Sequence, residues 1–216
     1  MIEKNEKIIQ IISNVLNIIF EKYYLKANTI KTLCDCSEEI ICGKTPSTKV
    51  ESNWNGEIPF ITIPDMHNSI YVTSYERFLS SKGATSQSNK FLPKNSICVS
   101  CIATPGLVSL TSEISQTNQQ INSIICKKNI SPFYLYLLLN TKDMKQLIIN
   151  LGSGGSTTYN LNKNSFSNIE VKLLSPEDML KFDIEVKSFF DLIIEYNDKI
   201  KKLKVLKQHY LKKFFG

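Results

Sequence analysis

The feature that most limits the fold is the C-terminal stretch 176–216, which has no proline after Pro176 and no glycine before its last residue. Proline and acidic residues at its start suit the first turn of a helix. Backbone N–H groups in that turn have no partner within the helix, so the N–H that proline lacks is not missed, and the N-terminal end of the helix dipole favours negative charge. Apolar side chains then recur at alternating steps of three and four, with Lys207 as the one exception: Phe189, Ile193, Tyr196, Ile200, Leu203, Tyr210 and Phe214. The sequence predicts a helix of about 35 residues, roughly 50 Å long, with a heptad seam that needs a partner helix.

A second helix is predicted at residues 3–26. Ile8, Ile11, Val15 and Ile18 fall at helical spacing, with Leu25 two turns further on. Other apolar residues widen this stripe to more than half of the circumference, so we expect neighbours on several sides: Ile9, Ile12, Leu16, Ile19 and Phe20. The apolar run is too short to span a bilayer and no small-residue cleavage site follows it. We therefore expect no signal peptide and no membrane span.

The middle of the chain, 28–175, changes to short β-like runs separated by Gly, Pro, Asn and Ser. Strands are predicted at 57–63, 96–102, 107–110, 121–126 and 169–174, and helices at 132–139 and 143–151. The fold class is therefore α+β. Its expected parts are an N-terminal helix (1–27), a mixed domain (28–175) and a long coiled-coil helix (176–216).

Charge and cysteine content limit the functional classes. The net charge of +6 is concentrated at the end, since 199–216 holds seven lysines and no acid. Residues 28–175 hold 13 basic and 10 acidic residues, a balance of only +3, so DNA binding by this part must rest on a local patch. Six cysteines are not needed as disulfides in a chain with 42% apolar residues, which favours a reduced, cytoplasmic protein.

Few residues suggest chemistry. Cys98 and Cys101 form a C-x-x-C motif, but a spacing of three on a strand puts the two thiols on opposite faces, so buried, inert cysteines are favoured over zinc. Trp54 is interpreted as a core anchor in preference to a base-stacking platform. The glycine-rich segment 152–158 is either a flexible turn or a place where backbone N–H groups approach DNA phosphate. The motifs of common hydrolases, zinc proteases and nucleotide-binding enzymes are absent from the sequence, which indicates a protein without catalytic residues.

Several segments, in order, resemble the specificity subunits of type I restriction-modification systems. They are 43–66, with Trp54 and Gly56, then 91–108, 117–119, 131–136 and 155–171. Residues 3–24 resemble the helix that precedes the second recognition domain of a full subunit, and 210–215 resemble the end of the distal helix. Ile102 stands where the family usually has arginine, so no charged DNA contact is expected there.

The resemblance implies that 28–175 is a target recognition domain whose polar loops contact double-stranded DNA. Lysines would hold phosphates, whereas hydroxyl and amide groups can read base edges. The candidate contacts are Lys44, Thr45, Ser47, Lys49, Lys82, Ser86, Gln87, Asn89, Thr157 and Thr158.

A full subunit has two recognition domains and this chain has one, so we expect a homodimer that reads a palindromic bipartite site. The dimer would form through the seam Phe189, Ile193, Tyr196, Ile200, Leu203 and Tyr210. Methyltransferase subunits, which bind S-adenosylmethionine, and a motor-nuclease subunit, which uses ATP and Mg²⁺, are the implied partners. This chain itself is expected to bind no cofactor and no metal.

Two alternatives stay open at this level. One is a coiled-coil interaction protein whose middle domain binds protein and not DNA, which the weak charge balance of 28–175 supports. The other is an enzyme fragment, in which this chain is one module of a fused modification enzyme. The salt dependence of binding would separate DNA recognition from protein binding, because phosphate contacts make the affinity for DNA fall as the salt concentration rises.

Overall fold

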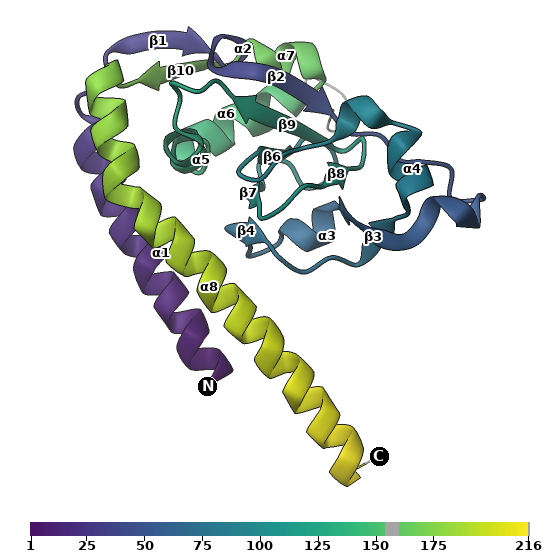
Figure 1. Ribbon diagram of the computed structural model, residues 1–216. Helices are drawn as coiled ribbons and strands as arrows, with labels where there is room; N and C mark the ends of the chain where they lie inside the picture. Colours follow the sequence, from purple (N-terminus) through teal and green to yellow (C-terminus); the bar gives the residue numbers. More distant parts are fainter. Residues whose placement is uncertain (154–159, 216) are drawn as a thin grey trace.

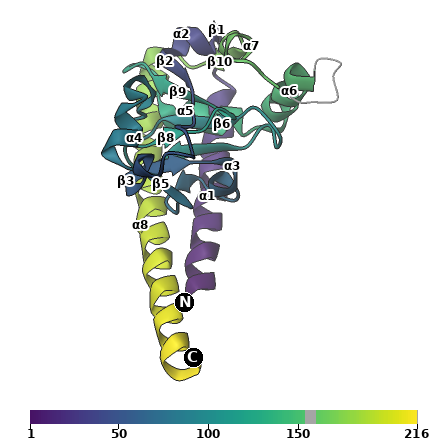
Figure 2. The ribbon, with the colours of Figure 1, turned by 90° about the vertical axis from the view of Figure 1, so that its right-hand side faces the viewer.

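A computed structural model describes residues 1–153 and 160–215. It is an α+β structure in which two long helices, α1 (Ile2–Tyr24) and α8 (Pro176–Phe215), pack side by side, and the mixed domain lies against their upper part (Figure 1). Both helices confirm the sequence prediction. Figures 1 and 2 show that α8 continues well past the N-terminal end of α1 and away from the domain. Nothing among the described helices is both long and apolar enough to cross a membrane.

The buried face of α1 differs from the predicted stripe. Ile11 and Ile18 are 61% and 67% exposed, and the side chains that pack inward are Ile12, Leu16, Phe20 and Tyr23. Aromatic contacts explain the choice of face, because the Tyr23 ring meets Phe182 of α8 edge-on with centroids 5.4 Å apart. The Tyr23 hydroxyl also donates a 2.9 Å hydrogen bond to Glu185. The outward face of α1 therefore carries exposed isoleucines.

The predicted seam of α8 is partly used inside the chain. Ile193 and Ile200 are buried, whereas Tyr210 is exposed. At the upper end the fully buried ring is Phe190 and not the predicted Phe189, which is half-buried. Phe190 stacks on Phe133 of α5 (Pro132–Leu139), with centroids 4.3 Å apart. The N-terminal half of α8 thus packs on α5 as well as on α1, and this second neighbour shifts the buried stripe.

The main sheet of the domain has five strands in the order β2 (Ser37–Cys42), β9 (Ile121–Cys126), β6 (Ile97–Ser100), β7 (Val108–Thr111) and β4 (Tyr71–Val72). The pairs are antiparallel except β4 with β7. Alternate side chains point to opposite faces. Val99 and Ile124 join the core shared with α5 and α8, whereas Cys98 and Ile121 join a smaller cluster on the other face.

Two smaller sheets complete the domain. β3 (Trp54–Ile61) pairs with β5 (Arg77–Leu79) and, in parallel, with β8 (Gln116–Thr117); β1 (Thr29–Thr32) pairs with β10 (Glu170–Leu173). The remaining helices are α2 (Leu33–Cys36), α3 (Ile63–Met66), α4 (Ser81–Thr85), α6 (Lys142–Ser153), α7 (Lys163–Ser167) and the 3₁₀ turns η1 (Glu51–Asn53) and η2 (Ser88–Lys90).

One strand prediction needs a correction at its end. The predicted strand 57–63 begins earlier, at Trp54, and stops at Ile61. Thr62 then caps the short helix α3, because the Asp65 carboxylate accepts hydrogen bonds from the backbone N–H and the hydroxyl of Thr62, both at 2.7 Å. This capping box, with Pro64 in the first turn, ends the strand before the apolar run ends.

Candidate nucleic-acid interface

The loop 43–50 leaves β2 and lies along the turn between β8 and β9. The backbone N–H of Gly43 donates to the Ile121 carbonyl at 3.1 Å, and that of Lys44 to the Thr117 carbonyl at 3.0 Å. Thr45 donates from its hydroxyl to the side-chain oxygen of Gln119 at 2.6 Å. A Cβ on Gly43 would overlap the carbonyl oxygen of Asn118, so only glycine allows this approach. The first half of the loop is therefore fixed to 117–121.

The second half of the loop is fixed by Trp54. The Ser47 carbonyl accepts hydrogen bonds from the indole N–H of Trp54 at 3.2 Å and from the Asn53 amide at 3.1 Å. The Trp54 ring packs edge-on against Phe60, with centroids 5.3 Å apart, at the border of the cluster under β3 and β5. This position agrees with its interpretation as an anchor.

The helix α4 joins this loop from a distant part of the sequence. The Ser80 hydroxyl donates to the Ser52 carbonyl at 2.6 Å, and the Lys82 ammonium to the Ser52 hydroxyl at 3.2 Å. A Cβ on Gly83 would overlap the Asn53 carbonyl. Because the two backbones are this close, two predicted contact segments, 43–49 and 82–89, form one surface.

The side chains predicted to contact DNA differ in how far they are exposed to solvent. Gln87 is only 4% exposed. Its amide donates to the side-chain oxygen of Gln116 at 2.6 Å, and Gln116 in turn donates to the Ala84 carbonyl at 3.0 Å. Gln87 therefore ties α4 to β8 and does not present its side chain at the surface. Thr45 is half-buried, and six of the predicted side chains are exposed: Lys44, Ser47, Lys49, Lys82, Ser86 and Asn89.

A further segment, 101–107, continues the same edge. The Cys101 N–H donates to the Gln120 carbonyl at 2.8 Å, and its carbonyl accepts from the Leu161 N–H at 3.0 Å. Ile102 forms a β-bridge with Asn160. The described residues on either side of 154–159 meet here, because the Asn160 N–H donates to the Gly152 carbonyl at 3.0 Å. Thr157 and Thr158 lie outside the described residues. We call the surface formed by 43–53, 80–90, 101–107 and 116–120 the loop edge.

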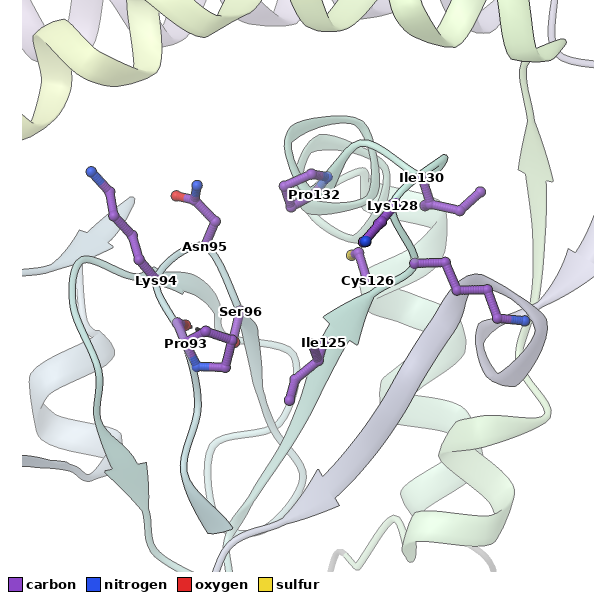
Figure 3. A pocket seen from close by; sticks show the side chains of 10 residues that line it. Pro93, Lys94, Asn95, Ser96, Ile125, Cys126, Lys128, Ile130 and Pro132 are labelled. Carbon is purple, nitrogen blue, oxygen red and sulfur yellow. Dashed lines mark hydrogen bonds between the residues drawn. The ribbon is translucent and has the colours of Figure 1, made fainter. Parts of the chain in front are cut away.

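The C-x-x-C cysteines and the pocket beside β6 form neither a metal site nor an acid–base site among the described residues. Those residues include no cluster of three or more potential metal ligands. Cys98 and Cys101 belong to cores on opposite faces of β6, and burial raises the pKa of each thiol to about 12, which keeps both protonated. A pocket of about 240 Å³ lies between the turn before β6 and the start of α5 (Figure 3). Its lining contains lysines and no acid, so it holds no acid–base pair.

Arg77 is the residue of this region that the sequence reasoning missed. Its guanidinium carbon lies 3.6 Å from the centroid of the Trp54 ring. The signal available in the sequence was that each is the only residue of its kind in the chain. Their separation by 23 positions in the sequence gave no indication of the contact, which depends on the pairing of β3 with β5.

The loop edge is a polar surface built from several segments on a rigid sheet, which is typical of a recognition domain. The family model described as "Type I restriction modification DNA specificity domain" matches residues 26–178. The chain belongs to this family, and the resemblance read from the sequence is thereby confirmed.

Two relatives give the comparison more detail. The chain is 46% identical over 174 residues to the type I restriction enzyme HindI specificity subunit of Haemophilus influenzae, which covers 81% of this chain and 38% of that protein. It is 36% identical over 163 residues to the type I restriction enzyme MjaIX specificity subunit of Methanocaldococcus jannaschii, covering 74% of this chain and 37% of that one. The matched part of the chain thus covers well under half the length of these relatives.

Solved structures agree on the fold. A type I restriction-modification S subunit from M. genitalium superposes with a TM-score of 0.66 over 100% of this chain and 58% of that one. The HsdS subunit from Thermoanaerobacter tengcongensis gives 0.57, over 98% and 52%. Both are 14% identical in sequence, so the likeness concerns the fold alone. This likeness confirms the α+β class, because the mixed domain and the long helices superpose together on those structures.

Proposed function

We propose that this chain is the non-catalytic DNA-recognition subunit of a cytoplasmic type I restriction-modification complex and that it reads one half of a bipartite site with its loop edge. The observation that carries the proposal is that side chains from the loop 43–50 and from α4 are brought onto one surface by hydrogen bonds between Lys82, Ser80 and Ser52. A rigid surface of this kind can present hydroxyl and amide groups to base edges at fixed positions. The family match falls on the same domain and so favours DNA over the protein-binding alternative.

The domain limits in the proposal are 1–27, 28–175 and 176–216. Lys44, Lys49 and Lys82 would contact phosphates, and Thr45, Ser47, Ser86, Asn89, Thr157 and Thr158 would contact bases or their neighbours. Gln87 enters only as a support for α4. Methyltransferase and motor-nuclease subunits would assemble with this chain, and S-adenosylmethionine and ATP with Mg²⁺ would bind to those partners.

The division between phosphate and base contacts makes a testable prediction. Lys82→Ala is expected to weaken binding about equally for all DNA sequences and to lower the slope of log K against log salt by about one. Ser86→Ala is expected to change the preference among sequences instead. Titration of a panel of duplexes at several salt concentrations measures both quantities.

Lys31→Ala is the matched control, because Lys31 is an exposed lysine on β1, at the opposite end of the domain from α4 (Figures 1 and 2). It should leave the salt slope and the preference unchanged. A Lys82→Ala protein with the salt slope of wild type would remove α4 from the interface.

We also propose that a second copy covers the lower part of α8. Large apolar side chains are exposed near the C-terminal end of this helix: Val205, Leu206, Tyr210, Leu211 and Phe214. Burial of each large apolar side chain is worth roughly 1.5–3 kcal/mol, so helices from a second chain would stabilise this end. A two-fold dimer would place two identical loop edges on a palindromic site.

Light scattering tests the dimer. The wild-type chain is expected to show about twice its chain mass of 24.6 kDa at micromolar concentration. Leu206→Glu combined with Tyr210→Glu should give the single-chain mass, since charges in an apolar helix contact are unfavourable. Lys202→Glu, which changes charge at an exposed lysine of the same helix, is the control and should stay dimeric. A monomeric wild type would contradict this part of the proposal.

A further inference from the structure

Arg77 is the only arginine among 26 basic residues. It lies on β5 directly opposite Phe60 of β3, and its guanidinium carbon is 3.6 Å from the centroid of the Trp54 ring. This distance corresponds to stacking of the flat guanidinium on the indole face, a contact that is favourable for arginine in particular. In a chain that otherwise uses lysine for every positive charge, this position requires a planar side chain.

The Trp54 ring that holds Arg77 is itself fixed. Its N–H donates to the Ser47 carbonyl at 3.2 Å, and its edge packs against Phe60. The stack therefore lies where the loop 43–50 meets β3 and β5, next to the loop edge. A side chain that is held on one face by a fixed ring keeps a defined direction for its donors.

The donors of Arg77 are not used inside the described part of the chain. Arg77 is half-buried, and neither an ion pair nor a hydrogen bond to another described residue engages its guanidinium. The Asp65 carboxylate, which contacts the residue before Arg77, already accepts from Thr62 and from the backbone N–H of Glu76 at 3.0 Å. Five N–H donors in a fixed plane are thus left for a ligand.

We propose that Arg77, stacked on Trp54, reads a guanine of the DNA half-site through two parallel hydrogen bonds to O6 and N7. This inference rests on the proposed DNA recognition. The planar guanidinium matches these two acceptors of guanine in the major groove. A phosphate can also be held by lysine as a point charge, and lysine is what the chain uses elsewhere, whereas a guanidinium fixed in one plane suits two acceptors on one base edge. Arg77 is therefore a specificity-determining residue, and Trp54 is its positioning residue.

The test uses the wild-type chain and Arg77→Met on duplexes that carry the recognised half-site, with 7-deazaguanine replacing each guanine in turn. The modified base lacks the N7 acceptor and still pairs with cytosine. Wild type should lose affinity at one guanine, and Arg77→Met, whose side chain has no N–H donor, should be insensitive to the same replacement. Discrimination of that base pair against the other three should fall by about five- to 150-fold in Arg77→Met.

Each other outcome has a defined meaning. If the wild type prefers certain sequences but tolerates 7-deazaguanine everywhere, or if Arg77→Met weakens all sequences equally, the guanine contact is wrong. A wild type without any sequence preference would instead refute the proposed DNA recognition itself. Thermal unfolding of Arg77→Met and Trp54→Phe shows whether Arg77 acts only on stability. A purely structural role would lower Tm without changing the discrimination at one particular base pair. The 7-deazaguanine series uses the wild-type chain, so it gives a result even if the variants do not fold.

Discussion

Phe182→Ala is expected to lower the free energy of unfolding by about 3–5 kcal/mol. Phe182 is fully buried and its ring meets Tyr23 of α1 and Tyr134 of α5 edge-on, with centroids 5.4 Å and 5.5 Å away. Its removal leaves a cavity where α1, α8 and the domain meet, so one substitution weakens the attachment of the domain to both helices. Urea unfolding of the purified chain measures the loss.

Leu180→Ala is the matched control for this prediction. Leu180 lies two residues away on the same helix but is 63% exposed, so its truncation is expected to change stability by less than about 0.5 kcal/mol. Equal losses for the two variants would show that α8 presents a different face to α1 than the structure has.

Gly43→Ala is expected to reduce binding of the recognised sequence to the non-specific level, which for DNA-binding proteins is about 10³-fold or more weaker. The added Cβ would overlap the backbone carbonyls of Thr117 and Asn118, neither of which is the end of a flexible side chain. The loop 43–50 must then separate from 117–121 and lose the geometry that presents its side chains. Titration with specific and random duplexes measures the two affinities.

Val50→Ala, in the same loop, is the control. Val50 is exposed and its truncation removes no contact between the loop and 117–121, so both affinities should stay close to wild type. Should Gly43→Ala retain full affinity and preference, the loop 43–50 would not belong to the reading surface.

The sequence was sufficient for elements with a strong local signal. The helix at 176–215 follows from an unbroken stretch with apolar periodicity, and α5 from Ser131 and Pro132 before an apolar run, where the Ser131 hydroxyl accepts from the Tyr134 N–H. The sequence was not sufficient to predict which face of a helix is buried. Because α1 is apolar over more than half of its circumference, periodicity could not choose between Ile11 with Ile18 and Leu16 with Phe20; the aromatic contacts with α5 and α8 decide.

Short strands and the composition of the site depended on tertiary pairing. β4, β5 and β8 have only two or three residues, and each exists because a longer strand pairs with it, so no local pattern could predict them. The exposed polar loops were predicted from residue type, but Gln87 was placed among the surface contacts because its buried partner Gln116 is 29 positions away. Arg77 was missed for the same reason.

Mapping of modified bases in the genome, with and without this chain, tests the central claim most directly. Cells that contain the chain and the proposed methyltransferase subunits are expected to carry methylation at a bipartite motif whose two halves are inverted repeats. Deletion of the chain should remove methylation at that motif alone. The Gly43→Ala chain should fail to restore the motif, whereas Val50→Ala should restore it. A methylation pattern that is identical with and without the chain would contradict the assignment of DNA recognition to its loop edge.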